Sequence, residues 1–147
     1  MAGKDVKQLI KQVLEKGYLM SLGTVDDGGV WVSDVIYVFD GDFTLYWMSK
    51  LHRRHSKAIE KSPQVAGTIT AYTKIGYELG IQFEGVAQKI EGVRFDLAKK
   101  HCAKRGKPEP KETDDVLDGG AWYMAKPKKI ELICQEHFGY EKQKLEF

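Results

Sequence analysis

The residues best suited to chemistry lie in one stretch, Leu45–Ile59, where an apolar strand pattern runs into closely spaced cations. A short helix is predicted over Arg53–Lys61, and Ser62-Pro63 ends it. The first N–H groups of a helix lack internal partners and carry the positive end of the helix dipole, so a phosphate binds well there. The hydroxyl and cations available to such a phosphate are Ser49, Lys50, Arg53, Arg54 and His55.

This stretch predicts an anion site, because an arginine guanidinium can hold two phosphate oxygens at once. The aromatic pair Tyr46 and Trp47 lies directly upstream, where a flat ring attached to that phosphate would have to lie. A solvated basic helix on the surface is the alternative that the run by itself leaves open.

The same stretch also holds two histidines, His52 and His55, at a spacing that can place both imidazoles on one helical turn. No carboxylate or cysteine accompanies them at ligand spacing, so no metal site is predicted. Serine, cysteine and histidine are not paired at any spacing that indicates an activated nucleophile, so no catalytic residue is predicted.

Length and composition predict one compact globular domain over residues 1–147, with 42% hydrophobic and 30% charged residues. The net charge of +2 is too small for a dedicated nucleic-acid-binding protein. Two cysteines, Cys102 and Cys134, are too few for a disulfide framework and are expected to be reduced thiols. The chain carries no apolar run of membrane-spanning length and no signal-peptide pattern, so a cytoplasmic protein without membrane contact is expected.

Hydrophobic periodicity predicts a mainly β protein with peripheral helices. Helical spacing covers Lys4–Lys16 and Val93–Lys104, and Gly106–Gly120 is an irregular loop. Three β-rich runs with turn signals between them predict an antiparallel meander, and further strands follow. The expected strands are Tyr18–Val25, Val30–Phe39, Phe43–Met48, Gln64–Tyr72, Gly80–Ile90, Ala121–Met124 and Lys129–Cys134, with Phe138–Phe147 as an edge strand.

Strands ordered by hairpins, two main helices and one short helix at the anion site favour a small antiparallel barrel. On the second strand, Trp31, Ser33 and Val35 alternate with Val32 and Asp34. Both faces carry bulky groups, so one face is expected to line the core and the other to meet a ligand or a second subunit.

In this order of elements the chain resembles the pyridoxamine 5′-phosphate oxidase-like family of FMN-binding split β-barrels, which are of Greek-key type. The resemblance rests on Val32-Ser33-Asp34-Val35, Phe39-Asp40-Gly41-Asp42, a strand ending at Ser49, Arg54-His55, Ser62-Pro63 and Gln82-Phe83-Glu84-Gly85. Gly80–Gly85 and Phe138-Gly139 are similar to an uncharacterised bacterial branch. The authentic oxidase has a C-terminal arginine–any–histidine signature that does not occur after Phe138, so oxidation of pyridoxamine phosphate is not implied.

The resemblance implies two FMN molecules bound at a homodimer interface. Ser33 and Val35 match a strand that lines the isoalloxazine, and Trp47 and Met48 match the segment beside the ring. Ser49 matches the hydroxyl at the strand end. The other matched or neighbouring positions are Lys50, Arg53, Arg54 and His55, together with Gln82, which lies near a family glutamine that can come from the second subunit.

The function expected from this resemblance is an FMN-dependent oxidoreductase acting on an unknown small molecule, with NAD(P)H as a candidate donor. A carrier of FMN or a redox sensor is the non-enzymatic alternative. A nucleic-acid-binding groove is a third interpretation, in which Trp47 or Tyr72 stacks on bases and nearby cations neutralise phosphates. Those cations are Lys50, Arg53, Arg54, Lys57, Lys99, Lys100, Lys104, Arg105 and Lys107.

Overall fold

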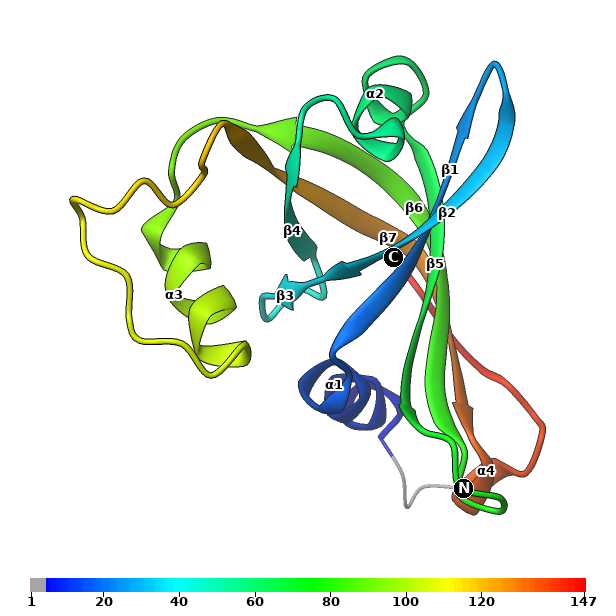
Figure 1. Ribbon diagram of the computed structural model, residues 1–147. Coiled ribbons are helices and arrows are strands. Elements are labelled where there is room, and N and C mark those ends of the chain that lie inside the picture. The colour runs from blue at the N-terminus through cyan, green and yellow to red at the C-terminus, as the bar shows by residue number, and fades with distance from the viewer. Residues whose placement is uncertain (1–4) are drawn as a thin grey trace.

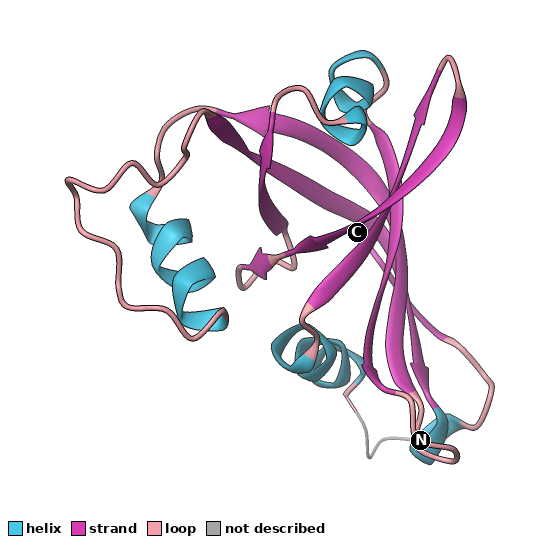
Figure 2. Ribbon diagram, in the orientation of Figure 1, coloured by secondary structure: helices cyan, strands magenta, loops and turns pink. Residues whose placement is uncertain are grey.

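The protein is an antiparallel sheet with helices around it, seen in a computed structural model that describes residues 5–147 (Figure 1, Figure 2). The helices are α1 (Val6–Lys16), α2 (Arg54–Lys61), α3 (Phe95–Lys104) and α4 (Gln135–Phe138). The strands are β1 (Leu19–Asp26), β2 (Gly29–Ile36), β3 (Val38–Phe39), β4 (Leu45–Lys50), β5 (Gln64–Tyr72), β6 (Leu79–Ile90), β7 (Gly120–Cys134) and β8 (Gln143–Glu146).

The order of the strands makes the sheet curl into a split barrel. That order is β2-β1-β5-β6-β7-β4-β3, with β8 paired to β7 outside this path. Because β2 ends at Ile36 and β3 begins at Val38, only Tyr37 separates the strands at the two ends of the order. The sheet must therefore bend back until its two edges approach each other, as Figure 1 shows. The prediction of a mainly β, antiparallel split barrel is confirmed.

Helix α1 packs its apolar face against the inside of this curl. The Asp5 side chain begins the helix by accepting a hydrogen bond from the Lys7 backbone N–H at 2.9 Å. The buried side chains of the helix are Leu9, Ile10, Val13 and Leu14. The Tyr37 hydroxyl donates to the Leu14 carbonyl at 2.8 Å, so the residue that joins β2 to β3 is also tied to the helix.

Helix α3 covers the outer side of β4 and gives that strand two buried faces. Leu45 and Trp47 point into the barrel core, whereas Tyr46 and Met48 pack in a second cluster with α3 residues Leu97 and Ala98 and with Trp122. Successive side chains of a strand point to opposite faces. Neighbouring residues of β4 therefore face different surroundings, and this decides which of them reach the functional site.

Two predicted strand arrangements are wrong. Val30–Phe39 is not one strand of a meander, because it divides into β2, which pairs with β1, and β3, which pairs with β4 at the other edge. The two predicted C-terminal strands are one strand, β7, and Pro127 lies within it. The strand passes the proline through a register shift opposite Gly85, where an added Cβ would lie 2.9 Å from the Pro127 Cα.

The remaining elements agree with the predicted ones apart from their ends. The expected C-terminal edge strand Phe138–Phe147 is shorter, because α4 extends to Phe138 and the only part of this segment that pairs with β7 is β8 (Gln143–Glu146). The first residue of the predicted N-terminal helix, Lys4, lies outside the described residues. Within residues 5–147, no helix combines the length and apolar character that a membrane span needs.

Candidate functional site

A cleft lies where the two edges of the sheet approach each other, bordered by β2, β4, the start of α2 and the end of α3. Its volume is about 870 Å³, which is within the range of small-molecule sites, roughly 300–1,000 Å³. The sheet contributes Leu19, Trp31, Ser33, Asp34, Val35, Ile36, Met48, Ser49 and Lys50. The helices and the loop after α3 contribute Arg53, Arg54, His55, His101, Arg105, Val116, Leu117 and Asp118.

One end of the cleft is built from the end of β4 and the first turn of α2. Ser49 Oγ lies 2.8 Å from His55 Nε2, and Ser56 Oγ donates to Ser49 Oγ at 3.2 Å. Burial, and next the charge of Arg53, lower the pKa of His55. The contact with His55 Nε2 and the hydrogen bond from Ser56 hold the Ser49 hydroxyl in position at this end of the cleft.

The first turn of α2 leaves backbone donors for a ligand. Arg53 occupies the N-cap position, but its side chain makes no capping hydrogen bond, and the first turn contains no acidic residue. The first N–H groups of the helix thus lack the carboxylate or hydroxyl that commonly satisfies them. Within residues 5–147, no carboxylate lies within 4.0 Å of Arg53. Charge and donors together suit a phosphate.

Arg54 is oriented by contacts with the β1–β2 hairpin. Its Nε and Nη2 donate to the two carboxylate oxygens of Asp26 at 2.8 and 3.0 Å, and its guanidinium lies 4.6 Å from the centre of the Trp31 ring. The hydrogen bond from Arg54 lowers the pKa of Asp26. A Cβ on Gly28 would lie 3.0 Å from Arg54 Nη2, so glycine makes room for this pair. Two of the three guanidinium nitrogens are therefore engaged, and Nη1 remains for a ligand.

Most of the predicted site residues line this one cleft, although they come from separate segments. Those that line it are Ser33, Val35, Met48, Ser49, Lys50, Arg53, Arg54 and His55. Trp47 does not, because its side chain is fully buried in the barrel and stacks on Tyr123 with ring centres 6.0 Å apart. Gln82 lies on the outer face of the sheet, in register with Thr68 and Glu131, and does not border the cleft of its own chain.

Sequence reasoning did not identify the side of the cleft formed by α3 and the loop that follows it. His101 and Arg105 are four residues apart on α3 and at its end, so both face the cleft. Burial lowers the pKa of His101 to about 4, and the charges of Arg105 and Lys104 act in the same direction. The i, i+4 spacing of the histidine and the arginine could be read from the sequence. The sequence did not indicate that both side chains border one cleft.

The Ser49–His55 pair could suggest a hydrolytic nucleophile, but its surroundings do not complete one. Ser49 Oγ also accepts a hydrogen bond from Ser56, and among the described residues no carboxylate is hydrogen-bonded to His55. The part of the chain that the structure describes also contains no group of three residues able to hold a metal ion. The arrangement can bind an anion and a flat apolar group, and the residues present do not form a catalytic triad.

Comparisons with known proteins agree with the split-barrel fold. A family model described as pyridoxamine 5′-phosphate oxidase matches residues 6–134. A UPF0306 protein of Photorhabdus laumondii is 34% identical over 100 residues, which are 67% of this chain and 70% of that protein. HutZ, the haem storage protein of Vibrio cholerae, superposes with a TM-score of 0.67 and 18% identity, covering 91% of this chain and 100% of HutZ. An F420 reductase superposes with a TM-score of 0.63 and 18% identity, covering 82% and 94%.

Proposed function

Because this chain belongs to the pyridoxamine 5′-phosphate oxidase family, we propose that its cleft binds FMN and that the protein is an FMN-dependent oxidoreductase. The observation that carries the proposal is the end of the cleft at α2. There, Arg53 has no carboxylate partner among residues 5–147. The first turn of the helix also has uncapped N–H groups, and Ser49 is held by His55. These donors suit a phosphate, and the cleft beyond them is large enough for a ring system.

In this proposal Arg53, Ser49 and the first amides of α2 hold the phosphate, and Arg54 adds its free Nη1. Val35 and Met48 form apolar walls for the isoalloxazine, and Ser33 offers a hydroxyl beside it. Bound FMN would supply hydride transfer, which the side chains of the cleft do not provide. The tasks of the chain itself are to bind the phosphate, orient the ring and exclude water from it.

We also propose that a second copy of the chain covers the outer face of the β1–β2 hairpin. The register pairs Val25 with Val30 and Gly23 with Val32, which places these residues on one face. Val30 and Val32 are 74% and 61% exposed, an unusual state for adjacent strand valines. Leu19, on the same face, also borders the cleft. A partner on this face would reach the mouth of the cleft. Gln82 lies on the outer face of the sheet, so the Gln82 side chain of that second copy could contact the cleft of the first.

Two alternative functions differ from this proposal in what they require of the chain. A nucleic-acid groove needs exposed aromatic rings among the cations, but Trp47 is fully buried and Tyr72 borders a different cavity beside Lys16. Lys104 is also unavailable, because its Nζ lies 3.2 Å from the centre of the Tyr37 ring and donates to the Tyr37 carbonyl. An FMN carrier would use the same cleft as an enzyme, so turnover of NAD(P)H in the presence of an electron acceptor separates those two.

The proposal is tested by titrating the cofactor-free protein with FMN and with riboflavin, which lacks the phosphate. We expect saturable binding of FMN that quenches flavin fluorescence, and much weaker binding of riboflavin. Equal affinity for both flavins would show that the phosphate is not bound at the α2 end of the cleft. No binding of either flavin, or tight binding of haem in their place, would overturn the FMN assignment.

A further inference from the structure

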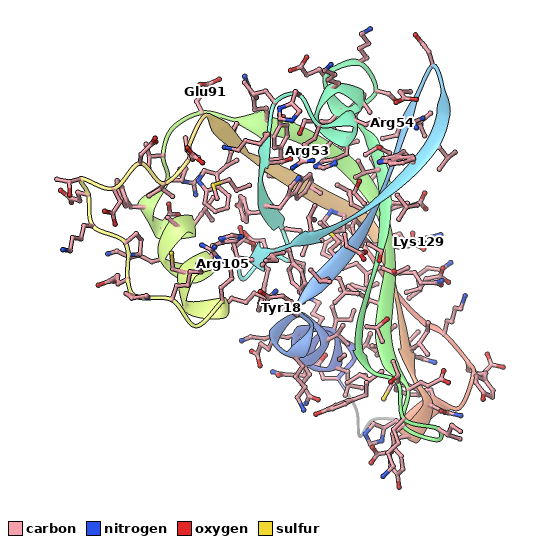
Figure 3. The ribbon with its side chains drawn as sticks, in the orientation of Figure 1. Tyr18, Arg53, Arg54, Glu91, Arg105 and Lys129 are labelled. Carbon is pink, nitrogen blue, oxygen red and sulfur yellow. The ribbon has the colours of Figure 1, made fainter. Side chains whose placement is uncertain are left out.

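The four arginines of the chain divide into two kinds. Arg54 and Arg94 each form a two-point ion pair, with Asp26 and Asp96 respectively. Arg53 and Arg105 have no carboxylate within 4.0 Å among residues 5–147. Both of these line the same cleft, and they reach it from different elements, Arg53 beside α2 and Arg105 at the end of α3 (Figure 3). One phosphate at α2 accounts for Arg53 but not for Arg105.

The guanidinium of Arg105 is held in place by its own helix. Its Nε donates to the His101 carbonyl at 3.3 Å, and its Nη2 lies 3.6 Å from Cys102 Sγ. These contacts use one side of the planar group and leave Nη1 and one N–H of Nη2 unengaged. That edge is the one that can bind both oxygens of a carboxylate. Arg105 is therefore pre-oriented without being neutralised.

Arg105 stands at the junction of the cleft with a second cavity of about 370 Å³. Met48, His101, Arg105 and Val116 line both spaces. The second cavity continues under the loop after α3 along mostly apolar walls that include Ala98, Trp122, Pro108 and Pro110. A flat apolar group fits these walls, and the unengaged cation at the entrance adds a place for one negative charge.

The neighbouring carboxylates do not neutralise the charge of Arg105, and the neighbouring histidine adds no positive charge. Glu109 also borders the second cavity but is 3.7 Å from Lys99 Nζ, and Asp114 accepts from the Lys111 backbone N–H at 2.8 Å. His101 carries no charge near neutral pH, because its pKa is lowered. Its ring packs edge-on against Trp122 with ring centres 5.6 Å apart. Lys107 and Lys111 also line the second cavity but not the cleft, so Arg105 is the cation that borders both spaces.

The loop over this second cavity is attached to the sheet at the cleft. Lys50 Nζ lies 3.2 Å from the Asp118 carboxylate, and the same ammonium group donates to the Asp118 carbonyl. Asp118 and Gly119 both have positive φ, at 46° and 82°, which turns the loop into β7. The end of the loop is therefore anchored to the last residue of β4, beside the cleft.

From these observations we propose that Arg105 binds the anionic group of the substrate, and that the substrate is a small organic carboxylate with a flat apolar body lying against Met48 and Val116. This assignment rests on the proposed function, since it gives the cofactor the α2 end and the substrate the α3 end. Arg105 is then the residue that determines specificity for charge.

The test uses benzoate as the probe and benzamide, which is neutral and of the same shape, as its control. Protein labelled with ¹⁵N is titrated with each, with and without FMN, and the indole N–H resonances of the three tryptophans are followed. Trp47 and Trp122 are both fully buried, but only Trp122 borders the second cavity. We therefore expect benzoate to shift the Trp122 resonance and to leave the Trp47 resonance in place. Benzamide should bind at least about tenfold more weakly, because it lacks the charge that pairs with the guanidinium.

The variant Arg105→Ala should weaken benzoate binding roughly ten- to hundredfold and leave FMN affinity unchanged. Lys89→Ala, which removes an exposed cation that borders neither cavity, should bind benzoate like the wild type. Equal binding of benzoate and benzamide by the wild-type protein would refute the proposal even if the variant did not fold. Failure to bind FMN would refute the proposed function, whereas the titration without FMN tests the carboxylate site by itself.

Discussion

Replacing Arg53 with alanine tests the phosphate site most directly, provided that FMN and riboflavin are compared on both proteins. Arg53 has no carboxylate partner among the described residues, so its removal leaves no protein charge unpaired. The loss therefore reports the contact with the ligand. A charge-assisted hydrogen bond contributes about 1.5–3 kcal/mol, which corresponds to a roughly 10- to 150-fold change in Kd for FMN.

Riboflavin makes the measurement specific for the phosphate. Arg53→Ala should change riboflavin affinity by less than about 0.5 kcal/mol, so almost all of the loss should appear as a coupling energy between Arg53 and the phosphate. Fluorescence quenching of each flavin at fixed, low ionic strength provides the four dissociation constants. An equal loss for both flavins would contradict the reasoning, because Arg53 would then contact the ring or act through the fold.

Arg54→Ala serves as the matched control at the adjacent position. Its guanidinium is bound to Asp26 and lies over Trp31, so the substitution should lower thermal stability and loosen the β1–β2 hairpin. The coupling to the phosphate should be smaller than for Arg53, because only Nη1 is available to the ligand. A larger coupling for Arg54 would show that this side chain leaves Asp26 when FMN binds.

Three other predictions concern pH and assembly. The pKa of His55 is lowered in the free protein, and a bound phosphate should raise it, so the protein should take up a proton when it binds FMN. Calorimetry in buffers of different ionisation enthalpy measures this proton uptake, which should be absent in the variant His55→Gln. The pKa of His101 is about 4 in the folded protein, against about 6.5 for a solvent-exposed histidine. Between these two pH values the unfolded state binds more protons than the folded state. The contribution of His101 to the free energy of unfolding is therefore complete above pH 6.5 and falls by up to about 3 kcal/mol toward pH 4. Denaturant unfolding of the variant His101→Gln should lack this part of the pH dependence. Val32→Asp should convert a homodimer to monomers in sedimentation experiments, and an unchanged mass would place the interface elsewhere.

Local sequence patterns were sufficient for the fold class and for most elements of the site. Helix α1 follows from apolar residues at helical spacing after Asp5, and β5 from the β-branched run Gln64–Tyr72. The candidate anion site at Leu45–Ile59 was recognisable because its strand end, its cations and its short helix are consecutive in the chain. Resemblance to a family added the split-barrel closure, which the structure confirms, and the proposal that the cofactor is FMN.

Other features depend on contacts between segments that are distant in sequence. The pairing of Arg54 with Asp26 joins residues 28 positions apart, so no local pattern indicates that two of its nitrogens are engaged. Trp47 and Met48 looked equivalent beside the anion site. Because α3 covers the outer side of β4, however, Trp47 belongs to the barrel core and Met48 to the cleft.

By itself, then, the sequence determined the residues that can hold a phosphate and the strand and helix that present them, since these follow from local periodicity and helix-end chemistry. Only the tertiary structure decided that α3 and its following loop form the opposite side of the cleft. Arg105 became part of the site because the closure of the sheet brings β4 and the end of α3 to one space. Backbone propensity acts over a few residues, whereas this closure is set by packing across the whole chain.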